Sequence, residues 1–245
     1  MRLVVVVLAA CSSSTQPREE EARPIAIAIA GDAAPVAIDA PPVDAAPPPL
    51  AVVEAPIHWT AERERLTLEY RKRHNDPKAT DLAIAPRVIV LHYTGGGSAK
   101  ATRGYFDNVR IEASRPALAK GGAVNVSAHY LVDRDGTIYR LQDETRFARH
   151  CIGLNHIAIG VENVGDTKKW PLTDAQVAAN VALVRDLARR FSITHLLGHH
   201  EVMSFRDHAY FVEREPGYQN DKPDPGAAFM ARVRAEVGEL KLSGI

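Results

Sequence analysis

The sequence predicts an α/β fold, with a central mixed β-sheet flanked by helices in a single domain. Short apolar runs rich in β-branched residues indicate buried strands, and residues 87–91 and 157–164 are the clearest of them. Segments with helical periodicity separate these runs, and one pair of shorter strands is joined by a tight turn. Because strands alternate irregularly with helices and include a hairpin, we expect both parallel and antiparallel neighbours in the sheet.

The first part of the predicted domain holds two helices and one strand. A helix is expected over residues 60–73, because Thr60 is a suitable N-cap and the following residues tolerate a helix. Residues 87–91 follow a proline and read as a buried strand. Three glycines come soon after this strand, and Ser98 is then expected to cap a second helix that runs to about Ile111.

The middle of the chain predicts a hairpin followed by a further buried strand. Residues 129–133 alternate as a strand does, and residues 137–141 return after the turn. Asp135 and Gly136 between them form a strong hairpin signal, since this pair favours the tight turns that join antiparallel strands. Residues 157–164 then supply another apolar strand.

The strongest helix signal in the chain covers residues 173–190. Thr173 and Gln176 are spaced as a capping box, and apolar side chains recur along one face. That face consists of Val177, Val181, Val184, Leu187 and Ala188. A short strand is expected at 194–198. A last helix is expected to begin at Asp224-Pro225, with the proline at its first position.

Length and charge limit the classes of function. The 245 residues suffice for one sizeable core and a tail, because domains usually run to about 100–200 residues. Lys and Arg together number 30, as do Asp and Glu, so the formal net charge is zero. A nucleic-acid binder normally carries a basic footprint, so no nucleic-acid partner is expected. Cys11 and Cys151 are too few for a disulfide framework, and Cys151 is expected to be a buried thiol.

The start of the chain is typical of a bacterial lipoprotein signal peptide, expected over residues 1–10. A single arginine precedes eight apolar residues, whereas a membrane-spanning helix needs roughly 20. The run ends in Leu-Ala-Ala-Cys, which resembles a lipobox, so we expect cleavage before Cys11 and a lipid on Cys11. An ordinary signal peptide is the alternative. A lipid would anchor the chain in the cell envelope facing the periplasm, at the outer membrane rather than the inner.

Residues 11–55 are expected to hold the lipidated cysteine and a disordered linker rich in alanine and proline. Such a segment cannot bury enough apolar area to offset its chain entropy. Proline-rich linkers are extended spacers, so this one would let residues 56–245 reach a polymer away from the membrane.

Polar residues that could carry chemistry stand where predicted strands end. His92 follows one buried strand, His199 follows another, and Asp224 lies in a Lys-Pro-Asp-Pro-Gly run. Two imidazoles and a carboxylate suit a catalytic zinc ion with a fourth position for water, so Zn²⁺ is the expected cofactor. Taken singly, His92 could be a satisfied core histidine and Asp224 a helix N-cap. His150 and His156 are expected at the surface or in a cleft.

Five segments, in order, carry a resemblance to a known family. They are residues 88–94, 127–137, 159–163, 198–199 and 222–226. Together they resemble the type-2 N-acetylmuramoyl-L-alanine amidases, relatives of the peptidoglycan recognition proteins. The lipobox adds a resemblance to the lipoprotein amidases of Gram-negative envelopes. The resemblance implies zinc ligands at His92, His199 and Asp224, and catalytic roles for Glu162 and Lys222.

The implied activity is hydrolysis of the amide between N-acetylmuramic acid and L-alanine, with peptidoglycan or muropeptide fragments as the partner of the catalytic domain. Zinc lowers the pKa of water from about 15.7 toward 7 and polarises the carbonyl. Glu162 would move a proton from water to the leaving amine, and Lys222 would stabilise the oxyanion. Two alternatives stay open, namely a non-catalytic peptidoglycan-binding module and a zinc peptidase of the stem peptide.

Three features depart from the family pattern. An insert at about 203–220 contains several aromatic residues and could be a substrate lid or a packed loop. His200 beside His199 leaves the second ligand ambiguous by one residue, and His199 is preferred because it follows a glycine directly. Ala128 stands where some branches carry a tyrosine, which indicates the branch that relies on the glutamate.

Overall fold

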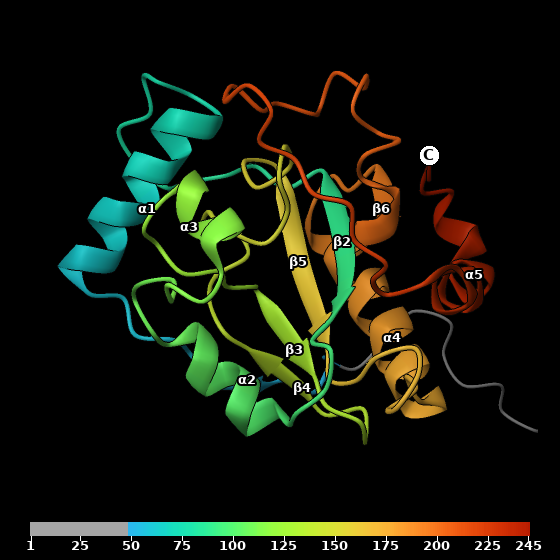
Figure 1. The fold of residues 1–245 in the computed structure, drawn as a ribbon. Coiled ribbons are helices and arrows are strands. Elements are labelled where there is room, and N and C mark those ends of the chain that lie inside the picture. Colours follow the sequence, from blue (N-terminus) through green and yellow to red (C-terminus); the bar gives the residue numbers. More distant parts are fainter. Residues whose placement is uncertain (1–48) are drawn as a thin grey trace, which may run out of the picture. The chain divides into compact units, whose positions relative to one another are not determined.

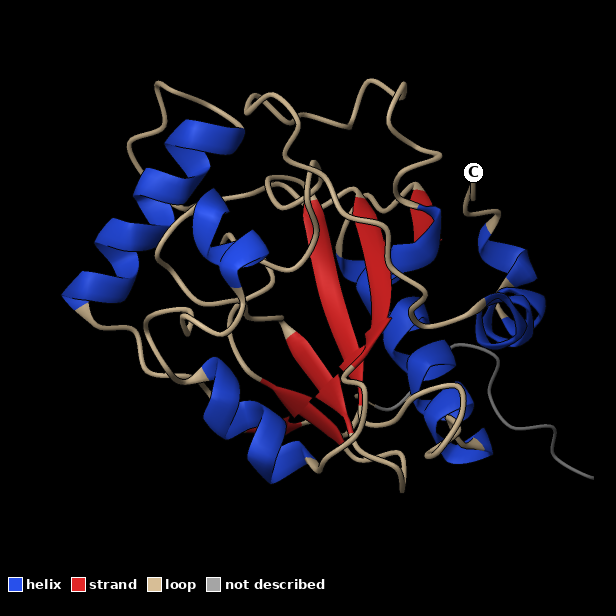
Figure 2. Cartoon of the chain, in the orientation of Figure 1, coloured by secondary structure: helices blue, strands red, loops and turns tan. Residues whose placement is uncertain are grey.

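The computed structural model describes residues 49–245, which form a sheet between helices and confirm the predicted α/β class (Figure 2). The strands are β1 (Val53–Glu54), β2 (Val88–Tyr93), β3 (Tyr130–Val132), β4 (Ile138–Arg140), β5 (Ala158–Asn163) and β6 (His195–Gly198). The helices are α1 (Ala61–His74), α2 (Ala99–Phe106), α3 (Pro116–Gly121), α4 (Asp174–Arg190) and α5 (Ala227–Glu236), with 3₁₀ turns η1 (His199–Glu201) and η2 (Gly238–Leu240). Within the described residues, no helix is long and apolar enough to cross a membrane. The predicted signal peptide, Cys11 and most of the predicted linker lie outside this part of the chain.

The six strands stand in the order β1-β4-β3-β5-β2-β6 (Figure 1). β3 and β4 pair antiparallel across the predicted turn, which confirms the hairpin. β5, β2 and β6 run parallel to one another, and β3 runs parallel to β5. The parallel strands therefore bring their C-terminal ends to one edge of the sheet, where open α/β proteins place their sites.

The folded domain begins before the expected boundary at residue 56. Val53 and Glu54 pair parallel with Tyr139 and Arg140 of β4 and so extend the sheet at its edge. A two-residue strand is too short to produce an alternating pattern, so its neighbours in space, and not its own sequence, decide its conformation.

Two helices have different limits from those predicted. α2 ends at Phe106 instead of Ile111, because Arg63 donates hydrogen bonds to the carbonyls of Phe106 and Asp107 and so satisfies the helix end. α5 begins at Ala227, not at the Asp-Pro pair, and no side chain caps it. The short helix α3 was not expected. The end of α2 is thus determined by a contact between segments distant in sequence.

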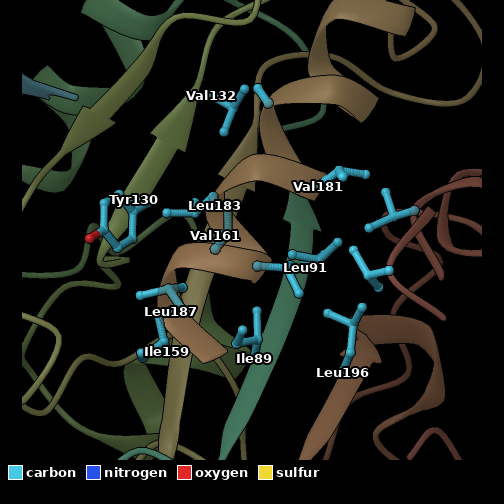
Figure 3. Close-up of a cluster of buried hydrophobic side chains, with 14 of the residues drawn as sticks. Ile89, Leu91, Tyr130, Val132, Ile159, Val161, Val181, Leu183, Leu187 and Leu196 are labelled. Carbon is cyan, nitrogen blue, oxygen red and sulfur yellow. The ribbon is translucent and has the colours of Figure 1, made fainter. Parts of the chain in front are cut away.

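α4 and α5 cover one face of the sheet and form its larger core. Alternate residues of a strand point to the same face, and Ile159 and Val161 of β5 point toward α4. Figure 3 shows Leu187 and Leu183 of α4 lying beside these two side chains. Each fully buried side chain of this size contributes about 1.5–3 kcal/mol. The capping box at Thr173 that fixes the start of α4 is present as predicted.

The opposite face of the same strands leads to the site. Val88 and Val90 of β2 pack there with Leu154 and the buried thiol of Cys151, as expected for that cysteine. His92 is the next residue of β2 in this alternating series. It therefore points away from α4, at the C-terminal end of the strand.

A buried chain of side-chain amides ties α4 to the strand ends. Asn163 donates to the carbonyl of His92 at 3.0 Å and accepts from Asn180 at 2.6 Å. Gln176 donates to the carbonyls of Val132 and Val164. Because buried polar groups are stable only when they are paired, this network holds β2, β3 and β5 in fixed relative positions just behind the site.

Candidate metal centre and active-site cleft

The register between β2 and β5 brings two of the predicted site residues, His92 and Glu162, together. His92 in β2 lies directly opposite Glu162 in β5, and both side chains point to the face not covered by α4. On the other side of β2, Leu91 pairs with Gly198, so β6 delivers His199 next to His92. Three parallel strands thus place three polar side chains at one edge of the sheet. The positions of His92 and His199 agree with the expectation from strand ends, and Glu162 was expected from the family resemblance.

His92, His199 and Asp224 form a compact buried cluster. The two Nδ1 atoms are 2.9 Å apart, and Asp224 Oδ2 lies 3.2 Å from Nδ1 of His92 and 3.1 Å from Nδ1 of His199. All three side chains are at most 8% exposed. Asp224 reaches the cluster from the segment before α5, so its carboxylate faces the histidines and does not cap that helix.

The donor atoms of this cluster fit a zinc ion. Ligands around tetrahedral zinc, at about 2.0–2.2 Å from the metal, lie about 3.3 Å from one another, close to the spacing seen here. Burial, with a lesser effect of His199, lowers the pKa of His92 to about 4, so its imidazole is neutral at pH 7. Burial alone would raise the pKa of Asp224, but the adjacent imidazoles of His199 and His92 hold it far below its ordinary value. A neutral imidazole at His92 and an ionised carboxylate at Asp224 are protonation states that a metal requires of such ligands.

His200, the alternative second ligand, lies outside the cluster. Its backbone N–H donates to the carbonyl of Asp224 at 2.8 Å, and its Nδ1 lies 3.3 Å from the same oxygen. The imidazole also packs over Gly198, where a Cβ atom would approach it to 2.7 Å. Of the two adjacent histidines, His199 is the one whose ring nitrogen meets His92 and Asp224.

His150 lines the cleft, as expected, and it also contacts His92 of the cluster, which was not predicted. Its Nε2 lies 3.3 Å from the carbonyl of Ala158 and must donate to it, so its Nδ1 accepts from Nε2 of His92 at 3.1 Å. This fixes the proton of His92 on Nε2 and leaves the Nδ1 lone pair for the cluster. Burial and the nearby His92 keep the pKa of His150 well below its usual range, in keeping with a neutral ring. Gly160 permits the contact, since a Cβ there would lie 2.6 Å from the ring.

A sequence signal for His150 did exist. The loop from Phe147 to Leu154 is mostly apolar and is buried in the fold, and a polar residue within a buried stretch needs a partner. His156, at the end of the same loop, contacts Asn75 at 3.4 Å and does not reach the cluster.

Replacing His150 with alanine is expected to weaken zinc binding by about 10–100-fold, because the partner that orients His92 is lost. The matched control is His156→Ala, which removes a neighbouring histidine without touching His92. Competition with a chromogenic chelator measures both affinities. Equal zinc affinity in His150→Ala and wild type would contradict the orienting role.

Glu162 and Lys222 line the same cleft as the cluster, a hollow of about 340 Å³. Glu162 is partly exposed, but its Oε2 is buried without a hydrogen-bond partner in the described chain. Burial, followed by the negative charge of Asp224, raises the pKa of Glu162 to about 8, against the opposing effect of Lys222. A carboxyl group held near neutrality is suited to accept and release a proton.

The insert at 203–220 packs as a loop and is tied to α1. Glu213 lies 2.8 Å from His74, and Glu215 forms an ion pair with Arg73 at 2.9 Å. The ring of Tyr218 lies tilted against that of His74, with ring centroids 4.6 Å apart. Only Asn220, at its end, contributes to the cleft wall. In Figure 1 this orange-red segment extends from β6 toward α1 and then returns to α5.

Comparison with known proteins identifies the family. The family of N-acetylmuramoyl-L-alanine amidases matches residues 82–227, more than half of the chain. The endolysin of Escherichia phage T7 is 33% identical over 100 residues, which cover 39% of this chain and 66% of the endolysin. The endolysin of Klebsiella phage KP32 is 31% identical over 107 residues, 42% of this chain and 70% of that protein. This chain therefore spans just under two thirds of the T7 protein's length.

A solved structure shares the fold. The N-acetylmuramoyl-L-alanine amidase LysC from Clostridium intestinale URNW superposes with a TM-score of 0.50 at 21% identity, covering 77% of this chain and 97% of that one. The matched family segment, residues 82–227, contains His92, Glu162, His199, Lys222 and Asp224. The chain belongs to the N-acetylmuramoyl-L-alanine amidase family.

Proposed function

We propose that this protein is a zinc-dependent hydrolase of peptidoglycan that cleaves the amide between N-acetylmuramic acid and L-alanine. The observation that carries the proposal is the common cleft, in which the His92, His199 and Asp224 donor atoms adjoin Glu162 and Lys222. Metal ligands alone would suit many zinc proteins. A carboxyl group of raised pKa and an ammonium group in the same hollow supply what hydrolysis of an amide requires.

Zinc, when bound by His92, His199 and Asp224, would supply Lewis-acid chemistry to the carbonyl and to water. The carboxylate of Glu162 accepts a proton from the attacking water and delivers it to the leaving nitrogen, which departs as the amine of alanine. The ammonium group of Lys222 donates a hydrogen bond to the oxygen on which negative charge develops. His150 holds the proton of His92 on Nε2 throughout.

Two other functions would use the same fold. A peptidoglycan-binding module needs neither Glu162 nor Lys222, so the presence of both beside a complete ligand set favours an enzyme. A zinc peptidase acting within the stem peptide would use the same residues, and only the products separate it from an amidase.

Product analysis tests the proposal. Purified full-length protein is incubated with muropeptides, with zinc or with a chelator, and the products are identified by mass spectrometry. We expect zinc-dependent release of free stem peptides that begin with L-alanine. Shortened stems still attached to sugar would indicate the peptidase, and intact muropeptides would indicate the binding module.

We also propose that a lipid on Cys11 holds the domain in the cell envelope, facing the periplasm, at the outer membrane. The support is the Leu-Ala-Ala-Cys sequence and the alanine- and proline-rich spacer that follows. Mass spectrometry of the N-terminal peptide from membrane fractions should detect a diacylglycerol-modified Cys11. An unmodified cysteine in the mature protein would contradict the proposal.

A further inference from the structure

Arg115 stands in the cleft with most of its hydrogen-bonding capacity unused. It lines the same hollow as the metal cluster, together with Tyr105 and Ser127. Its Nη1 donates to the hydroxyl of Tyr105 at 2.7 Å, and that hydroxyl in turn contacts Glu112 at 2.9 Å. The guanidinium also lies over the Tyr105 ring, 5.9 Å from its centre. These contacts orient the group and use one of its N–H donors.

A guanidinium has five N–H donors, and Tyr105 engages one of those of Arg115. Its Nε lies 3.9 Å from Glu112, beyond hydrogen-bond distance, and the side chain is 39% exposed. Neighbouring arginines are paired differently. Arg149 donates to three backbone carbonyls and a tyrosine, and Arg110 is paired with Glu62 at 2.6 Å on the outer surface. Among the described residues, Arg115 is thus the arginine that lines the cleft, and most of its N–H donors have no partner.

The backbone around Arg115 is also fixed. Its N–H donates to the carbonyl of Glu112 in a turn, and the next residue, Pro116, begins α3. A proline at the first helical position has a preset φ, so the side chain starts from a defined point. A guanidinium on a rigid base, with a free fork of donors, suits a planar anion that can be held by two parallel hydrogen bonds.

We propose that Arg115 binds a carboxylate of the stem peptide, on the residue that follows the alanine of the scissile amide. The inference rests on the proposed function, because it takes the substrate to be a muramyl peptide. The residue after alanine in such stems carries a carboxyl group that is either free or amidated, a few bonds from the reacting carbonyl. Arg115 would distinguish the two forms, because an amide cannot accept two charge-assisted bonds.

The charges of the cleft support this assignment. The positive charge of Arg115 is close enough to lower the pKa of Glu162, as does that of Lys222, so Arg115 lies within electrostatic range of the reacting centre. The cleft is lined by the cations Arg115 and Lys222 and by the carboxyl groups of Asp224 and Glu162, and a bound zinc ion would add two positive charges. An anionic peptide therefore meets a complementary field in this cleft.

The test is a pair of synthetic substrates, muramyl-L-alanyl-D-isoglutamate and its isoglutamine amide, with wild type and Arg115→Gln. Wild type is expected to prefer the acid by about tenfold or more in kcat/KM, mainly through KM. Arg115→Gln should lose that preference by weakening only the acid, which is the signature of a direct interaction in a double-mutant cycle. Arg110→Gln is the matched control and should keep the preference.

Binding of the same two ligands, measured by calorimetry, separates failure of the inference from failure of the proposed function. If wild type cleaves both forms equally, or if Arg115→Gln retains the preference, the inference is overturned. If zinc-loaded wild type cleaves neither form, the proposed function fails on these substrates, and the dissociation constants then decide. If wild type binds the acid more tightly than the amide and Arg115→Gln abolishes that difference, the carboxylate site is supported. If wild type binds the acid and the amide with equal affinity, the inference is overturned.

Discussion

Replacing Glu162 by glutamine is expected to lower kcat by about 10²–10⁴-fold while zinc remains bound at one ion per chain. Glutamine keeps the size of the side chain but cannot take up and return a proton. The substitution leaves unchanged His92, His199 and Asp224, the three residues proposed to hold the zinc ion. Metal analysis and amidase kinetics on the same preparation separate the two properties.

The pH profile provides a second check on Glu162. The carboxyl group must be ionised to accept a proton, so kcat/KM should rise with pH through its pKa. Burial raises that pKa to about 8 in the metal-free site, so the acid limb should lie above pH 4.5, even after a bound cation lowers it. This limb should vanish in Glu162→Gln. A variant that retains wild-type turnover, or the same acid limb, would show that another group moves the proton.

Replacing His199 by alanine is expected to weaken zinc binding by about 100-fold or more and to reduce amidase activity to background at low zinc. The change removes one of three donor atoms that lie within 3.2 Å of one another. His200→Ala is the matched control, because it removes an adjacent imidazole that contacts the backbone of Asp224 and not the cluster. It should bind zinc within about twofold of wild type.

Zinc dissociation constants and folding must be measured together for these two variants. Circular dichroism and thermal unfolding without metal should be similar for both, so that a difference in affinity reports coordination. If His200→Ala loses zinc and His199→Ala retains it, the assignment of the second ligand is wrong by one residue.

The site residues whose positions could be predicted from the sequence are those that directly follow a predicted strand. His92 and His199 each follow an apolar strand, and parallel strands of one sheet end at the same edge. The alternation of side chains then places Glu162 on the same face as His92. The strand period can be read from a short stretch of sequence, whereas the pairing of β2 with β5 comes from the structure. Glu162 was expected only through the family resemblance.

The remaining parts depend on contacts between distant segments. Asp224 is a typical N-cap residue by local sequence, and only the path of the chain before α5 turns it toward the histidines. His150 acquires its role from two partners, His92 and the carbonyl of Ala158, which no spacing along the chain reveals. The end of α2 is likewise determined by the side chain of Arg63 from another helix.

The most direct test of the account is a zinc titration of the metal-free protein, with release of alanine-initiated stem peptide as the readout. We expect no release without metal and a linear rise in rate that reaches its plateau at one zinc ion per chain. The same titration of His199→Ala should remain at background over this range. Full amidase turnover by the metal-free protein, or by His199→Ala without added zinc, would contradict the claim that the buried cluster is the catalytic metal site.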